Sequence, residues 1–143
     1  MSKLLRYLLW VGIIFTIACS PRISFFDQYA YTQVTSIKVD ALNLMSEAAD
    51  NFSVHENEVK AMDITIRKMI EYEKHRPKDS VTLKQWEKLY DPKKYLYGGF
   101  INRWRQKSKL DSAFIADQQN LIGKAFDQIA ELESGKLKSK EVK

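Results

Sequence analysis

Residues 112–134 read SAFIADQQNLIGKAFDQIAELES, and mostly apolar side chains recur there at steps of three and four. The members of this stripe are Ile115, Gln118, Ile122, Ala125, Ile129 and Leu132. Because an α-helix has about 3.6 residues per turn, this spacing places them on one face. Gly135 follows, where a helix end is favoured. The pattern predicts a long amphipathic helix, capped by Ser108 or Ser112 and ending near Ser134.

Two stretches upstream show the same spacing. From Ser24 to about Asn51, the stripe comprises Phe26, Ala30, Gln33, Ile37, Ala41, Leu44, Ala48 and Phe52. From Val54 to about His75, it comprises Val59, Met62, Ile66, Met69 and Ile70. Pro77 cannot continue the second helix. Three long amphipathic helices with short connections predict an all-α fold, an antiparallel bundle in which each stripe packs against the others.

The segment between the second and third long helices is less regular. Thr82 to Tyr90 is expected to form a short helix, and Gly98-Gly99 predicts a turn. Residues 100–107 have room for one or two helical turns. The fold prediction is therefore three long helices plus a short aromatic-rich helical segment that lies across one end of the bundle or along a groove.

This middle segment combines aromatic and basic side chains. Six aromatic residues fall within nineteen positions: Trp86, Tyr90, Tyr95, Tyr97, Phe100 and Trp104. Seven cations interleave with them: Lys84, Lys88, Lys93, Lys94, Arg103, Arg105 and Lys107. Aromatic faces and planar guanidinium groups together can bind an anionic surface, such as lipid headgroups, an envelope glycan or an acidic protein. The predicted binding surface consists of Lys93, Lys94, Tyr97, Arg103, Trp104 and Arg105.

A structural reading of the same segment stays open. In that reading Trp86, Phe100 and Trp104 belong to the core, and the stems of the cations lie over them with their charged ends in water. The charge distribution bears on the choice. The whole chain carries +5, but residues 76–109 hold ten basic and three acidic residues, between flanks of net negative charge. Segregated charge favours an anionic partner, although docking of the basic segment onto the acidic helices is the internal alternative.

The sequence offers little for catalysis or metal binding. It contains no Gly-x-Ser-x-Gly, no His-Glu-x-x-His and no phosphate-binding glycine-rich loop. Of its two histidines, neither belongs to the Glu-x-x-His element that di-metal helical bundles use. We therefore expect no enzymatic activity, no catalytic residue, no metal and no cofactor.

The N-terminus carries a different kind of signal. Lys3 and Arg6 precede an apolar run over residues 7–18, and the only cysteine, Cys19, follows Ala18 directly. A basic start, a short apolar run and a small residue before the cleavage point are typical of a secretory signal. With the cysteine placed there, residues 3–19 resemble the lipobox signal of bacterial lipoproteins. An uncleaved N-terminal membrane helix is the alternative, but the run is short for a bilayer span.

The resemblance implies a domain organisation and a location. Residues 1–18 would be a signal peptide, and residues 19–23 a short tether whose Cys19 carries diacylglycerol and palmitate. Residues 24–135 would form the bundle domain, and residues 136–143 a flexible Lys-rich tail. In enteric lipoproteins a residue other than Asp after the cysteine directs the protein to the outer membrane, so Ser20 implies the outer membrane, facing the periplasm. A nucleic-acid partner is not expected there.

These observations predict a non-catalytic envelope lipoprotein that acts by contact with a protein or a membrane surface. It would be an accessory subunit of an envelope complex or an exclusion or immunity-type protein. The alternative function is a ligand-binding carrier or enzyme with a pocket inside the bundle. Gln33 and Gln118, polar residues on otherwise apolar stripes, are the hint for that alternative.

Overall fold

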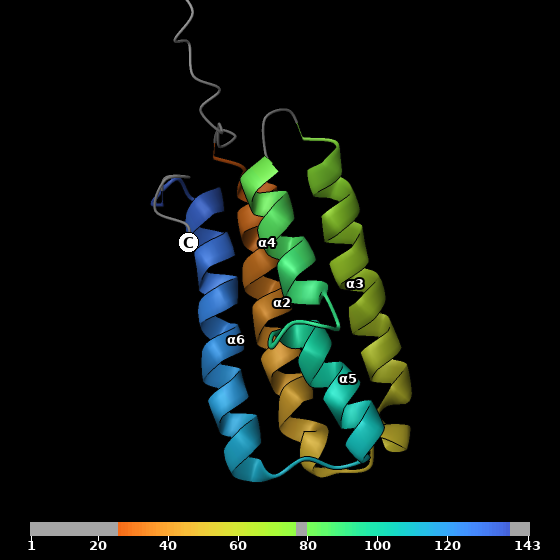
Figure 1. Cartoon of the computed structure of the whole chain (residues 1–143). Helices are drawn as coiled ribbons and strands as arrows, with labels where there is room; N and C mark the ends of the chain where they lie inside the picture. The colour runs from red at the N-terminus through yellow and green to blue at the C-terminus, as the bar shows by residue number, and fades with distance from the viewer. Residues whose placement is uncertain (1–25, 77–79, 138–143) are drawn as a thin grey trace, which may run out of the picture.

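The computed structural model describes residues 26–76 and 80–137, and this part of the chain is helical without any strand (Figure 1). Its α-helices are α2 (Gln28–Ser46), α3 (Glu56–Lys74), α4 (Ser80–Tyr90), α5 (Tyr97–Lys107) and α6 (Ser112–Glu133). Two 3-10 turns, η1 (Glu47–Ala49) and η2 (Phe52–Val54), connect α2 to α3. The all-α prediction is confirmed. The predicted signal peptide, Cys19 and most of the Lys-rich tail lie outside the described residues.

The core follows the predicted stripes closely. All five residues of the α3 stripe are buried, and so are Ile115, Ile122, Ile129 and Leu132 of the α6 stripe. The α2 stripe is buried from Ala30 onward, apart from the half-buried Gln33. None of the helices in the described ranges combines the length and the apolar character that crossing a membrane requires.

The middle segment forms the side of the bundle. Figure 1 shows α4 and α5 arranged roughly end to end between α3 and α6. Together the two short helices take the place of a fourth long helix, called here the fourth column. Trp86 and Leu89 of α4 are completely buried, and the Trp86 ring lies edge-on to Phe126 of α6 with 5.9 Å between ring centroids. Burial of these large side chains fixes the fourth column against the long helices.

Two glycines determine how α4 is joined to α5. Gly98 and Gly99 lie within the first turn of α5, so the turn prediction for this pair is wrong. A Cβ atom on Gly98 would collide with the backbone of Tyr90, and one on Gly99 with the carbonyl oxygen of Lys94. The absence of side chains lets the connecting loop lie directly on the helix it leads into.

Aspartates cap two of the long helices. Asp27 Oδ1 accepts a hydrogen bond from the Ala30 amide at the start of α2, and Asp111 Oδ1 accepts bonds from the first amides of α6. The predicted serine caps of the last helix are wrong. Ser108 instead has a φ of 66°, and its carbonyl oxygen accepts a hydrogen bond from the Phe52 amide at 2.8 Å. An Asp carboxylate satisfies the free amides of a first turn equally well.

A buried cluster of charged side chains joins the start of α2 to the ends of α3 and α6. Arg76, after the end of α3, contacts Glu73 at 2.9 Å and Glu133 of α6 at 2.7 Å. Its Nε lies 3.6 Å from Asp27, which also accepts a 2.7 Å hydrogen bond from the Tyr72 hydroxyl. Because these charges are desolvated, breaking the cluster leaves buried charge uncompensated, which is strongly unfavourable.

Candidate functional site

Two aromatic members of the predicted binding surface are buried. Trp104 is 0% exposed and Tyr97 only 2% exposed. Trp104 donates its indole N–H to the Asp50 carbonyl oxygen at 3.0 Å and lies edge-on to Phe52. Trp86 and Phe100 are buried as well, so the core reading is confirmed for the three side chains to which it was applied.

The basic members of the surface are exposed, but α5 divides them between two hollows. Lys93 and Lys94, from the loop before α5, and Arg103 line a groove of about 260 Å³. Arg105 lines a different pocket. The groove is bounded by Pro92, Lys93, Lys94, Tyr95, Gly99, Phe100, Asn102, Arg103, Gln106, Phe114 and Gln118. The loop of residues 91–96, α5 and the start of α6 therefore all contribute to it.

An aromatic stack forms the floor of this groove. The ring of Phe114 lies parallel to the buried Phe100, with 6.2 Å between ring centroids. The Arg103 guanidinium lies 4.3 Å above the Phe114 ring. A cation over an aromatic face is held in place while its N–H groups stay available to a further partner. Tyr95, 89% exposed, adds an accessible aromatic side chain at the edge of the groove.

The groove cations have no acidic partner in the described part of the chain. Within the described residues, no carboxylate oxygen comes within 4.0 Å of the side-chain nitrogens of Lys93, Lys94 or Arg103. The internal alternative, in which the basic segment docks onto the acidic helices, is therefore not what the structure shows for these three. Their positive charge faces solvent beside an apolar floor.

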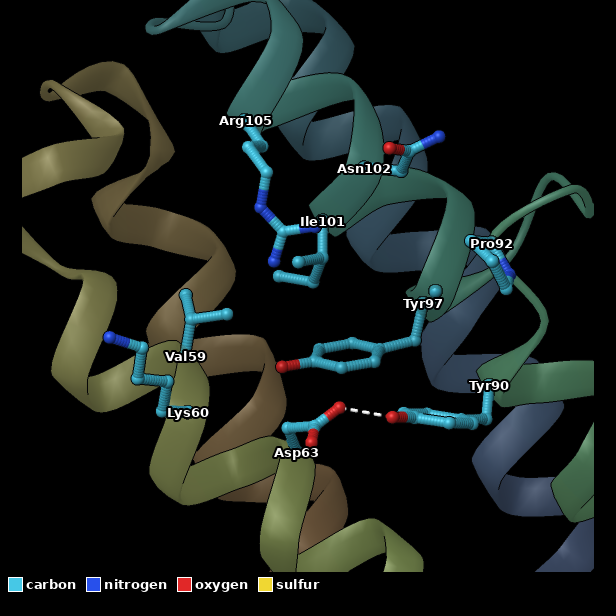
Figure 2. A pocket seen from close by; sticks show the side chains of 10 residues that line it. Val59, Lys60, Asp63, Tyr90, Pro92, Tyr97, Ile101, Asn102 and Arg105 are labelled. Atoms are coloured by element: carbon cyan, nitrogen blue, oxygen red, sulfur yellow. Dashed lines mark hydrogen bonds between the residues drawn. The ribbon is translucent and has the colours of Figure 1, made fainter.

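The second hollow lies between α3, the end of α4 and α5, and its volume is about 320 Å³. Figure 2 shows its walls, which are formed by Val59, Lys60, Asp63, Tyr90, Pro92, Tyr97, Gly98, Ile101, Asn102 and Arg105. Its volume is at the lower end of the range of roughly 300–1,000 Å³ that is usual for small-molecule sites. Gly98 allows α5 to start against α4, and this contact places Tyr97 beside Tyr90.

Asp63 is the charged centre of the pocket wall. The Tyr90 hydroxyl donates a hydrogen bond to Asp63 Oδ1 (Figure 2). The Arg67 Nε lies 3.3 Å from Asp63 Oδ2. Burial, together with this hydrogen bond to a carboxylate, raises the pKa of Tyr90 to about 12. Burial likewise raises the pKa of Tyr97 well above its usual range, with the nearby charge of Asp63 adding to the effect. Both phenols are hydrogen-bond donors at neutral pH.

Sequence reasoning missed Asp63 and Tyr90 as pocket residues. A usable signal was present, since Asp63 lies four residues after the buried Val59 and three before the buried Ile66. This spacing places the Asp63 carboxylate beside the buried stripe of α3, on the side of the helix that faces its neighbours. Tyr90 carried no comparable signal, because its neighbours in the pocket come from a different helix.

Three side chains in the connection between α2 and α3 could hold a metal ion. Ligand atoms of Glu47, Asp50 and His55 lie within 4.8 Å of one another. His55 Nδ1 is 2.8 Å from Glu58 Oε2, and the imidazole packs against the Trp104 ring. The two carboxylates of the trio are exposed. This geometry is equally that of a surface ion-pair network around one histidine, so we assign no metal to it.

The polar stripe residues do not form an interior site. Gln33 is half-buried on α2, Gln118 lines the groove, and no hydrogen bond joins the two side chains. The pocket that contains Asp63 and Tyr97 lies instead on the side of the bundle, between α3, α4 and α5. Comparison with protein-family models, curated proteins and solved structures gives no significant match to this chain.

Proposed function

We propose that this chain is a lipid-anchored envelope protein that acts by contact and catalyses no reaction. The observation that carries the proposal is the groove, which Lys93, Lys94 and Arg103 line without a carboxylate partner among the described residues, and in which Arg103 lies over the Phe114 ring. The partner surface would be anionic and would belong to an envelope protein or to lipid headgroups.

The arrangement of helices supports such a role. In this proposal α2, α3 and α6 form the antiparallel frame, and α4 and α5 carry the groove on its side. Gly99 supports the geometry directly, since it lets the loop that bears Lys93 and Lys94 lie on the first turn of α5. The three cations are thus presented by a packed surface, which lowers the conformational entropy lost on binding.

The location rests on the N-terminal signal. Acylation at Cys19 would hold the bundle at the outer membrane, facing the periplasm, where accessory subunits and exclusion or immunity-type proteins both work by contact. An anionic partner surface in that compartment would meet a groove of opposite charge. Electrostatic complementarity of this kind raises the association rate and selects the partner.

The test reverses the groove charges in the full chain. Lys93, Lys94 and Arg103 are changed together to Glu, and photo-crosslinked partners are recovered from intact membranes. The matched control changes three other exposed lysines, Lys84, Lys88 and Lys107, to Glu as well, so that the net charge of the chain falls by the same amount.

The expected result is loss of the crosslinked partner in the groove variant, with retention in the control and melting temperatures close to wild type. Wild-type binding should also weaken as salt rises, because exposed charges are screened. Equal loss of the partner in both variants would mean that only net charge matters. A large fall in melting temperature confined to the groove variant would assign these cations to folding.

A further inference from the structure

The pocket between α3, α4 and α5 contains a hydroxyl group without a protein partner. Tyr97 is 2% exposed, and its hydroxyl oxygen makes no hydrogen bond to any residue in the described part of the chain. Figure 2 shows this hydroxyl directed across the pocket toward α3. A buried donor without a partner costs about 1–3 kcal/mol. Such an atom, lying at a preformed hollow, indicates that a ligand group bonds it.

The charges of the pocket indicate the sign of that ligand. The carboxylate of Asp63 is already compensated by Arg67 and Tyr90, and the Lys60 ammonium lies 3.4 Å from Glu56. Arg105 has no carboxylate within ion-pair distance in residues 26–76 and 80–137, and its guanidinium lies 5.1 Å from the Phe52 ring centroid. One uncompensated positive charge therefore remains at the rim.

We propose that this pocket binds a small organic monocarboxylate, with Arg105 pairing to the carboxylate and the Tyr97 hydroxyl donating a hydrogen bond to the ligand. A guanidinium group matches the planar carboxylate through two parallel N–H···O bonds. The body of the ligand lies against Val59, Ile101 and the phenol rings. The pocket shares Pro92 and Asn102 with the groove but is lined by a different arginine.

The pocket discriminates against more highly charged anions. Arg105 is the one cation of its wall without a carboxylate partner among the described residues, so the second charge of a dianion such as phosphate would go unbalanced. The apolar parts of Val59, Pro92 and Ile101 favour a ligand with hydrocarbon or aromatic character over a small inorganic ion. An apolar body that carries a single negative charge satisfies both conditions.

The test uses defined probes and the full chain purified in a non-ionic detergent. Benzoate, 4-hydroxyphenylacetate and hexanoate are titrated, each beside its neutral amide, and binding is followed by saturation-transfer NMR and calorimetry. The pocket variants are Arg105→Gln and Tyr97→Phe. The matched controls are Lys107→Gln, which removes an exposed cation of α5 outside both the pocket and the groove, and Tyr31→Phe, which changes a 37% exposed phenol of α2.

We expect at least one of the carboxylates to bind roughly tenfold more tightly than its amide, the effect of a charge-assisted hydrogen bond. Arg105→Gln should remove that preference. Tyr97→Phe should weaken binding about threefold or more without lowering the melting temperature, since it removes a donor that has no partner in the free protein. The two control variants should bind like wild type.

Three results would overturn the proposal: no binding by any of the three carboxylates, equal binding of acids and amides, or the same loss in Lys107→Gln as in Arg105→Gln. A fall in melting temperature for Tyr97→Phe would show that the hydroxyl is bonded within the protein, and would also count against it. Failure of the groove experiment leaves these measurements unaffected, because the groove and pocket variants change different residues.

Discussion

Arg103 and Arg105 lie two residues apart on α5 and hold their guanidinium groups over different aromatic rings. Arg103 lies 4.3 Å from the Phe114 ring centroid, in α6, and Arg105 lies 5.1 Å from that of Phe52, in η2. Residues two apart on a helix point in different directions. The two guanidinium groups therefore line different hollows, and each arginine can be substituted while the other stays in place.

The lipid anchor is the first prediction. Cells supplied with a clickable fatty acid should label the wild-type chain and fail to label Cys19→Ser, because a thiol is needed for acylation. Labelling is read after gel separation, and mass spectrometry of the purified wild type should show that residues 1–18 are gone. A wild-type chain that takes up no label and keeps those residues would contradict the anchor.

The second prediction concerns the core. Ile122→Asp places a carboxylate at a position that is 0% exposed in α6, which should lower the free energy of unfolding by several kcal/mol. Leu121→Asp is the control. The Leu121 side chain, next to Ile122 in sequence, is 45% exposed, so the same change should cost less than about 1 kcal/mol there. Urea unfolding followed by circular dichroism measures both. Similar losses at the two positions would show that the buried face has been wrongly assigned.

A third prediction separates two glycines within helices. Gly99→Ala should destabilise the protein, because the new methyl group would collide with the Lys94 carbonyl oxygen, a backbone atom that cannot move without the loop. Gly123→Ala should be neutral or stabilising by up to about 1 kcal/mol, since its nearest neighbours are side-chain atoms at 3.7 and 3.8 Å. Melting temperatures compare the two. Tolerance of alanine at position 99 would mean that the loop does not rest on α5.

The fourth prediction is a pH dependence. The hydrogen bond to Glu58 raises the pKa of His55 above its ordinary value of 6.5, against the opposing effect of burial, and Glu47 and Asp50 add to the rise. The stability contributed by this histidine is fully present below its unfolded pKa and is lost as the pH rises through the higher folded value.

The measurement compares melting temperatures of the wild type and His55→Gln between pH 5 and pH 9. The advantage of the wild type should be greatest at the acidic end and should shrink as the pH rises past neutrality. A difference that stays constant over this range, or that grows at high pH, would show that the charged imidazole does not stabilise the fold.

The long helices could be predicted from the sequence because their apolar residues recur every three or four positions and so stay on one helix face over several turns. Phe26 is the exception in the α2 stripe. It is 59% exposed because it precedes the Asp27 cap, where the helix has not yet begun. The buried Glu73 and Glu133 also carried a signal, since they follow the buried Ile70 and Ile129 by three and four residues.

The candidate site was harder to predict, for a reason that lies in Gly98 and Gly99. When the pair is taken as a turn, the helix starts at Phe100, and Tyr97 is assigned to a loop. With α5 beginning at Tyr97, the residues Tyr97, Phe100, Ile101 and Trp104 form one helical stripe, and all are buried. The groove and the pocket also depend on Phe114 and Asp63, which belong to other helices and which no local pattern connects to α5.

The buried Arg76 cluster has a mechanical consequence. Asp27 begins α2, accepts the Tyr72 hydroxyl of α3 and lies 3.6 Å from Arg76, which in turn contacts Glu133 of α6. A pull on the chain ahead of residue 26 therefore loads three helices at their shared end, where it must shear several contacts together. Unravelling α2 turn by turn would need the ionic cluster to open first. A tethered molecule of this design should therefore unfold under tension in one cooperative step, because the contacts at this end break together.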